Sequence, residues 1–233
     1  MPETIRSPLS WKPVQPPCRA ALHGRYVTLE PLEADRHTSD LWTAVRGHDE
    51  VWTWLADGPY GTQGELHRAL REKENSSSAV FFAIVPNPGS KAADASSSTG
   101  GRAAGYASFM RIEPAHGALE VGNILLAPTL QRTTAATEAM YLMASHVFDT
   151  LGYRRYEWKC NAENAPSRRA ALRLGFTFEG IFRQHMVIKD RNRDTAWFAM
   201  LDSEWPARKQ AFEAWLNPAN FDSGDVQKKR LRS

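Results

Sequence analysis

The chain has 233 residues, of which 42% are apolar and 24% charged, enough for one domain with a substantial core. Its 29 basic and 26 acidic residues nearly balance, which argues against nucleic acid as a partner. The two cysteines are far apart, and no stretch approaches the ~18 apolar residues of a membrane span. We therefore expect a cytoplasmic protein without a membrane partner.

Composition divides the chain into three parts. Residues 1–24 are rich in proline and polar groups and are predicted to form an N-terminal arm, whereas 25–216 form a single domain. Within that domain, 87–102 is dominated by Ser, Ala and Gly and is expected to be a flexible loop, because it cannot bury a core. Residues 217–233 form a basic tail whose "KKRLR" end is predicted to be solvated, with a contact site as the alternative.

Apolar residues recur at two-residue intervals in some segments and at three- and four-residue intervals in others, which indicates strands and helices. In chain order, the predicted strands are 25–32, 79–86, 103–113, 118–128, 154–162, 176–184 and 194–202. The predicted helices are 33–48, 62–75, a helix that ends near 150, 165–175 and 206–216. The last two strands form a hairpin across the polar turn "KDRNRD".

The order of these elements predicts an α+β fold. Three consecutive strands between the second and third helices imply an antiparallel meander. The strand–helix–strand unit from 118 to 162 implies a right-handed parallel crossover. We therefore expect a mixed, mostly antiparallel sheet of about seven strands with helices on both faces.

The stretch "LLAPTLQRTTAATEAM" (125–140) passes from a strand through a turn into a helix. A phosphate can bind at such a place, because helix N-termini offer free N–H groups and a positive dipole. The turn has no glycine, however, and plain capping by Thr133 or Thr134, with Glu138 in the first turn, explains the same residues. From the residues alone, both interpretations stay open.

Three motifs together resemble those of the GCN5-related N-acetyltransferases (GNAT), and more narrowly the RimJ/RimL-type branch. They are "LEVGNILLAP" (119–128), "QRTTAATEA" (131–139) and "NAPSRRAALRLGF" (164–176), and the likeness runs from about residue 24 to 202. The resemblance implies the GNAT fold and transfer of acetyl from acetyl-CoA to a primary amine. The acceptor would be a small amine, an amino acid or a protein N-terminus, and the protein a monomer or homodimer.

The resemblance also implies where acetyl-CoA binds. Thr134 stands where the family's middle glycine is usual, and its side chain affects how closely the diphosphate approaches. The implied cofactor-binding residues are Leu125, Leu126, Gln131, Arg132, Thr133, Thr134, Ala135, Ala136, Asn164 and Ser167. Asn164 and Pro166 also make a good helix start, so capping is the alternative for Asn164.

Glu120 is the leading candidate for the general base. By strand alternation it shares a face with Ile124 and Leu126, although a bulge would break that count. A carboxylate among apolar neighbours has a raised pKa, which suits a base; the alternative is a glutamate paired with an arginine. The resemblance places Ser167 near the thioester as the acid, since Ala171 occupies the position of the family's common tyrosine.

Other residues carry weaker signals. His185 is an alternative base, and Cys160 is expected to be a buried, unreactive thiol. Trp42, Trp52 and Trp54 either wall an acceptor pocket or pack in the core. The seven histidines lack metal-ligand spacing, so no metal is expected. The alternative function is a non-catalytic, acyl-CoA-binding module of the same fold.

Overall fold

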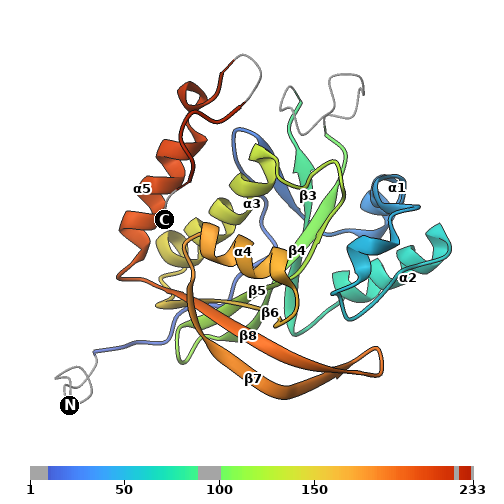
Figure 1. Cartoon of the computed structure of the whole chain (residues 1–233), viewed down its shortest axis with the longest axis horizontal. Helices are drawn as coiled ribbons and strands as arrows, with labels where there is room; N and C mark the ends of the chain where they lie inside the picture. Colours follow the sequence, from blue (N-terminus) through green and yellow to red (C-terminus); the bar gives the residue numbers. More distant parts are fainter. Residues whose placement is uncertain (1–9, 89–100, 223–225, 232–233) are drawn as a thin grey trace.

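The computed structural model describes residues 10–88, 101–222 and 226–231 (Figure 1). Its sheet has the strand order β1-β2-β3-β4-β5-β6-β8-β7. The strands are β1 (Leu22–His23), β2 (Val27–Pro31), β3 (Ala79–Pro86), β4 (Gly105–Glu113), β5 (Ala118–Leu126), β6 (Arg155–Asn161), β7 (Thr177–Ile188) and β8 (Arg191–Leu201). Every neighbouring pair is antiparallel except β5 and β6. The predicted mixed fold is confirmed, with eight strands rather than about seven, because β1 inside the predicted arm pairs with β2.

Helices cover both faces of the sheet. They are α1 (Ala34–Val45), α2 (Gln63–Glu74), α3 (Thr134–Ser145), α4 (Ala165–Arg173) and α5 (Trp205–Leu216), with short turns η2 (Asp49–Trp52), η3 (His146–Thr150) and η4 (Pro218–Asn220). One core lies between the sheet and α1 and α2, and the other lies under α3, α4 and α5 (Figure 1). Beyond Ser145, α3 continues as the π-helical turn η3, which ends at Thr150, where the sequence predicts the end of this helix.

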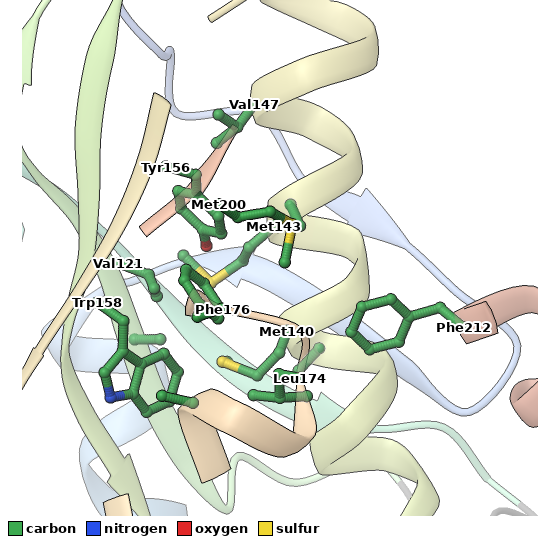
Figure 2. Packing of buried hydrophobic residues seen from close by; sticks show 14 of the residues in the cluster. Val121, Met140, Met143, Val147, Tyr156, Trp158, Leu174, Phe176, Met200 and Phe212 are labelled. Carbon is green, nitrogen blue, oxygen red and sulfur yellow. The ribbon is translucent and has the colours of Figure 1, made fainter. Parts of the chain in front are cut away.

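The larger core joins β5, β6 and β8 to the second set of helices. Val121, Tyr156 and Trp158 point from the strands toward Met140 of α3 and Phe212 of α5 (Figure 2). These side chains are nearly or fully buried. The alternation along β6 leaves its charged residues on the opposite face of the sheet, which none of the described helices covers at β6 and β8.

The β7–β8 hairpin is longer than the sequence predicts. The segment "KDRNRD" is not a six-residue turn, because the strands extend to Ile188 and from Arg191. Only Lys189 and Asp190 turn the chain, and both have left-handed φ angles, 49° and 57°. Two such residues form the tight turn whose twist matches antiparallel strands. The end of β7 and the start of β8 were not predicted as strand, because the residues around the turn are mostly polar.

Both chain ends pack against the domain. In the arm, Trp11 Nε1 donates to the Ala115 carbonyl (2.8 Å), and Arg19 donates to the Leu32 carbonyl (2.6 Å). In the basic tail, Leu231 is buried against the α5 core, so this end makes a contact beyond solvation. Most of the predicted loop 87–102 lies outside the described residues. None of the described helices is long and apolar enough to span a bilayer.

Candidate active site

A gap opens in the sheet where its two parallel strands separate. β5 and β6 are paired only from Ala118–Arg155 to Val121–Trp158. Beyond that point β5 continues along β4, and β6 continues along β8. Because no backbone bonds close the gap, groups from both faces of the sheet can reach a ligand that lies in it.

A bulge in β5 lies at the start of this gap. Ser108 pairs with Gly122 and Tyr106 with Leu125, so β5 carries one extra residue, and Asn123 has a left-handed φ of 50°. A bulge of this kind reverses the alternation of side chains along the strand.

The bulge corrects the predicted surroundings of Glu120. Ile124 and Leu126 pack against the core under α3, on the same side as Val121. Glu120, next to Val121, therefore points to the opposite face and does not share one with Ile124 and Leu126. Leu125 instead joins the core under α1 and α2.

Glu120 is buried and ion-paired. It is 5% exposed, and Lys159 Nζ and Arg111 Nε lie 3.1 and 3.0 Å from its Oε2. Neither contact has hydrogen-bond geometry, so Oε2 is a buried oxygen with charged neighbours but no hydrogen bond. Burial raises the pKa of Glu120, since desolvation outweighs the attraction of Lys159 and Arg111. The arginine pairing and the raised pKa, expected as alternatives, occur together.

Lys159 links Glu120 to the next strand. Its Nζ lies 2.6 Å from Glu157 Oε2 and 3.8 Å from the centre of the Trp197 ring. Burial opposes ionisation of Glu157, but hydrogen bonds from Lys159 and Arg155 keep its pKa below the usual value. Two glutamates that share a face thus have their pKa values pushed in opposite directions, as in sites with separate proton roles.

His185 reaches the same face through a second bulge. Between the pairs Phe182–Thr195 and Met186–Arg193, β7 has two more residues than β8. His185 Nδ1 lies 2.9 Å from Thr195 Oγ1. Desolvation, followed by the charges of neighbouring cations, lowers the pKa of His185, so the ring is neutral at pH 7 and able to accept a proton.

The turn before α3 offers free backbone donors. Thr133 caps the helix, with its Oγ1 accepting from Ala136 N at 3.1 Å, as one sequence interpretation expects. No described residue accepts from the N–H groups of Arg132, Thr134 and Ala135. Arg132 has a φ of 63°, and a left-handed residue beside helical ones turns successive N–H groups toward one point. Capping and anion binding are therefore compatible here.

The same geometry explains how the turn forms without glycine. Thr134 is the first residue of α3 and has no left-handed φ. The position that the family fills with glycine therefore needs no glycine for backbone reasons, and only the bulk of the threonine side chain matters. Gln131 steadies the turn, because its Nε2 donates to the Leu126 carbonyl at 3.0 Å.

Glu138 does not lie in the first turn of α3, contrary to expectation. It is 6% exposed, and its carboxylate accepts from the backbone N–H groups of Arg25, Tyr26 and Val27 at 3.0, 2.5 and 3.0 Å. This carboxylate joins α3 to the start of β2. Its role is structural rather than electrostatic support of the helix end.

Asn164 and Ser167 lie at the start of α4, beside the gap. Asn164 Oδ1 caps the helix by accepting from Ser167 N at 3.1 Å, and no described residue accepts from its Nδ2. Ser167 Oγ accepts from Trp158 Nε1 at 3.0 Å. Burial raises the pKa of the Cys160 thiol, so the protonated form is favoured, as expected for a structural cysteine. Ala171 is fully buried.

A pocket of about 310 Å3 lies between the C-terminal end of α1, the following loop and α2. Trp42, Trp52 and Tyr60 are among the residues that line it, whereas Trp54 is not. Lys189 at the tip of the β7–β8 hairpin donates to the Trp52 carbonyl at 2.9 Å, so the hairpin reaches this loop. Two of the three predicted tryptophans therefore line a cavity.

Sequence analysis missed several residues of this face. Lys159 and Trp197 stand opposite one another on β6 and β8, and Arg111 reaches Glu120 from β4. The alternation of charged and aromatic residues in 154–162 was a usable signal for Lys159. Its partner was not predictable, because pairing to Glu120 depends on the register of two strands far apart in sequence. Among the described residues, no cluster of His, Cys, Asp and Glu is arranged to hold a metal.

Comparison with known proteins defines the class. The profile of the acetyltransferase (GNAT) domain matches residues 27–177. A GCN5-related N-acetyltransferase from Brucella melitensis is 50% identical, with 95% of this chain and 96% of that one covered and a TM-score of 0.88. A probable acetyltransferase (GNAT family) from Chromobacterium violaceum ATCC 12472 is 38% identical, with 86% and 96% covered and a TM-score of 0.76. The chain belongs to the GNAT acetyltransferase family.

One curated enzyme is related in sequence to part of this chain. The ribosomal-protein-serine acetyltransferase of Escherichia coli (strain K12) is 32% identical over 101 residues, 43% of this chain. The match spans only 56% of that enzyme's length. Over this stretch the chain is similar to an enzyme of the RimJ/RimL type within the GNAT family.

Proposed function

We propose that the protein is an acetyl-CoA-dependent N-acetyltransferase that moves acetyl directly from the CoA thioester to a primary amine. The observation that carries this proposal is the strand gap, with unbonded N–H groups at one end and a buried carboxylate of raised pKa at the other. A protein N-terminus is the first acceptor to test, because one relative is named for a ribosomal protein. We propose a cytoplasmic location as well, because that is where a ribosomal protein would be the acceptor.

The residues present fit acetyl-CoA. Its diphosphate needs several donors and a positive helix end, which the N–H groups of Arg132, Thr134 and Ala135 at the start of α3 supply. Leu125, Leu126 and Gln131 lead into this turn, and Thr133 and Ala136 fix its shape. The unbonded amide Nδ2 of Asn164 suits a carbonyl of the pantetheine arm.

Glu120 is the proposed general base. The ammonium of an acceptor must lose a proton before its nitrogen attacks the thioester carbonyl, and the raised pKa of Glu120 brings its proton affinity closer to that task. As the C–N bond forms and the C–S bond breaks, the nitrogen releases a second proton and the CoA thiolate takes one up, so a hydroxyl between them passes a proton on and is itself restored. Ser167 lies beside the gap with its hydroxyl against Trp158, and we assign it that role. His185, neutral and on the same face as Glu120, is the alternative base.

Two measurements test the function. Thiol release from acetyl-CoA is followed with amino acids, polyamines, aminoglycosides and N-terminal peptides, and at least one should be acetylated. In parallel, acetyl-CoA at 100 times its Kd should stabilise the folded protein by about 2.7 kcal/mol. Stabilisation without turnover on any amine would favour a non-catalytic acyl-CoA-binding module. The absence of both effects would contradict acetyl-CoA binding altogether.

A further inference from the structure

Arg193 is a cation without a partner on the proposed catalytic face. Its side chain is half-buried, and its Nε is a buried donor that lacks a hydrogen bond. Neither a hydrogen bond nor an ion pair joins its guanidinium to any residue in the part of the chain that the structure describes. Since a buried donor without an acceptor is costly, native structures keep few of them, and a ligand that binds the guanidinium would supply the missing acceptor.

The position of Arg193 links it to the reaction site. It shares a face of β8 with Thr195 and Trp197, because residues two apart on a strand point the same way. Trp197 lies under Lys159, which reaches Glu120. Burial lowers the pKa of Arg193, and the charges of Cys160, Glu120 and Arg111 act on it as well, so these groups are neighbours.

Among the described residues, the two carboxylates nearest to Arg193 in the sheet are already engaged by other groups. Glu120 is already shared between Lys159 and Arg111. Asp194, the next residue along β8, accepts from Gln184 N and Asn192 Nδ2 at 2.8 and 2.9 Å, so its carboxylate serves the β7 bulge.

The charge balance of this face has a direct consequence for the acceptor. Among the described residues, four cations, Arg111, Arg155, Lys159 and Arg193, face the three carboxylates of Glu120, Glu157 and Glu179, so one positive charge is left over. An acceptor amine arrives as a cation and is repelled by that excess. An acceptor that also carries a carboxylate cancels the excess and gains a charge-assisted hydrogen bond to a guanidinium.

We propose that Arg193 binds a carboxylate of the acceptor and so selects amines with an acidic group close to the reacting nitrogen. This inference rests on the proposed function, and Arg193 is then an acceptor-binding residue. The carboxylate has two possible sources: the α-carboxylate of a free amino acid, or an acidic side chain near the N-terminus of a peptide. The chemistry is shared, and the experiment separates the sources.

The test compares acceptors that differ only in the carboxylate. One pair is an amino acid and its carboxamide, and the other is a peptide with Glu or Gln as its second residue. KM and kcat are measured for each with the wild type, Arg193→Gln, Arg193→Lys and the matched control Arg191→Gln, an exposed arginine on the same strand. The Kd of acetyl-CoA is measured by calorimetry for every variant.

We expect the wild type to prefer the carboxylate member of at least one pair. Arg193→Gln should raise the KM for that acceptor about 10- to 100-fold, the range for a charged hydrogen bond, with kcat little changed and the KM of the acceptor without a carboxylate unchanged or lowered. Arg193→Lys should restore part of the affinity, and Arg191→Gln should behave as the wild type. The pair that responds identifies the source of the carboxylate.

Three results would overturn the inference. The first is that the wild type uses both members of each pair equally. The second is that Arg193→Gln raises KM equally for both members. The third is weaker acetyl-CoA binding in that variant, which would assign the guanidinium to the co-substrate. The wild-type comparison decides the matter even where a variant fails to fold. Absence of turnover with every amine would instead count against the proposed function, and calorimetric binding of each acid and amide would still decide the inference.

Discussion

Two buried glutamates of this protein have nearly the same exposure and opposite surroundings. Glu138 is 6% exposed and accepts from three backbone N–H groups, so its carboxylate is fully engaged by neutral donors. Glu120 is 5% exposed and faces two cations, and one of its oxygens still has no hydrogen bond. Burial alone therefore does not distinguish a structural carboxylate from a reactive one.

The two carboxylates differ in the partners that surround them. A carboxylate whose acceptors are all used holds two elements together and loses nothing when substrate is absent. A buried carboxylate that contacts charged side chains and has a raised pKa takes up a proton more readily than an exposed one, and such groups are common at functional sites. The comparison predicts that loss of Glu138 impairs folding, whereas loss of Glu120 impairs turnover.

The largest expected effect is on catalysis. Glu120→Gln should lower kcat/KM by about 100- to 10,000-fold, the usual contribution of a general base, because the amide cannot accept the proton of the ammonium. The Kd of acetyl-CoA should stay close to that of the wild type. Steady-state thiol release and calorimetry measure the two quantities, with Glu163→Gln as an exposed control. A normal rate would remove Glu120 as the base and leave His185 to be tested by His185→Gln.

The second effect is on stability. Glu138→Ala leaves three backbone donors without their acceptor and should lower the free energy of unfolding by about 3 kcal/mol or more. Glu138→Gln keeps one acceptor oxygen and should cost less. Urea denaturation measures both, with Glu72→Ala on the exposed side of α2 as the control. A large loss of activity in folded Glu138→Gln at unchanged stability would contradict the structural role.

A smaller loss is expected at the cap of α3, the helix that Glu138 anchors. Thr133→Ala removes the acceptor of the Ala136 N–H and the donor to the Leu130 carbonyl, and should cost about 1 kcal/mol. Thermal unfolding compares it with Thr129→Ala, an exposed threonine of the same turn. Equal melting temperatures for the two variants would show that the anchor at Glu138, rather than the cap, holds the start of the helix.

The sequence predicted local features of the site better than long-range ones. Apolar alternation identified β5 and β6, and the spacing of Asn164 and Ser167 predicted a capped helix, because these patterns depend on near neighbours. The three N–H groups that bind Glu138 lie more than 110 residues away, so no periodicity reveals them. A one-residue bulge near Asn123 was enough to misplace the neighbours of Glu120.

The smallest expected effect is the pH dependence of stability that Glu120 causes. Its sign distinguishes Glu120 from its neighbours. The folded-state pKa of Glu120 is raised above its ordinary 4.5, so the folded protein holds this proton more tightly than the unfolded chain does. The contribution of Glu120 to stability is full below pH 4.5 and is lost as the pH rises through the folded-state pKa.

Glu157 has the opposite sign and serves as the matched control. Its pKa is lowered, so its contribution is present above pH 4.5 and is lost as the pH falls through the folded-state pKa. From pH 3 to 8, the stability of Glu120→Gln relative to the wild type should therefore rise with pH, mainly above pH 4.5, and that of Glu157→Gln should fall with pH, mainly below pH 4.5. Urea midpoints across this range measure both slopes. Parallel slopes would mean that Lys159 neutralises the two carboxylates alike, and the distinction between a reactive glutamate and its ion-paired neighbour would fail.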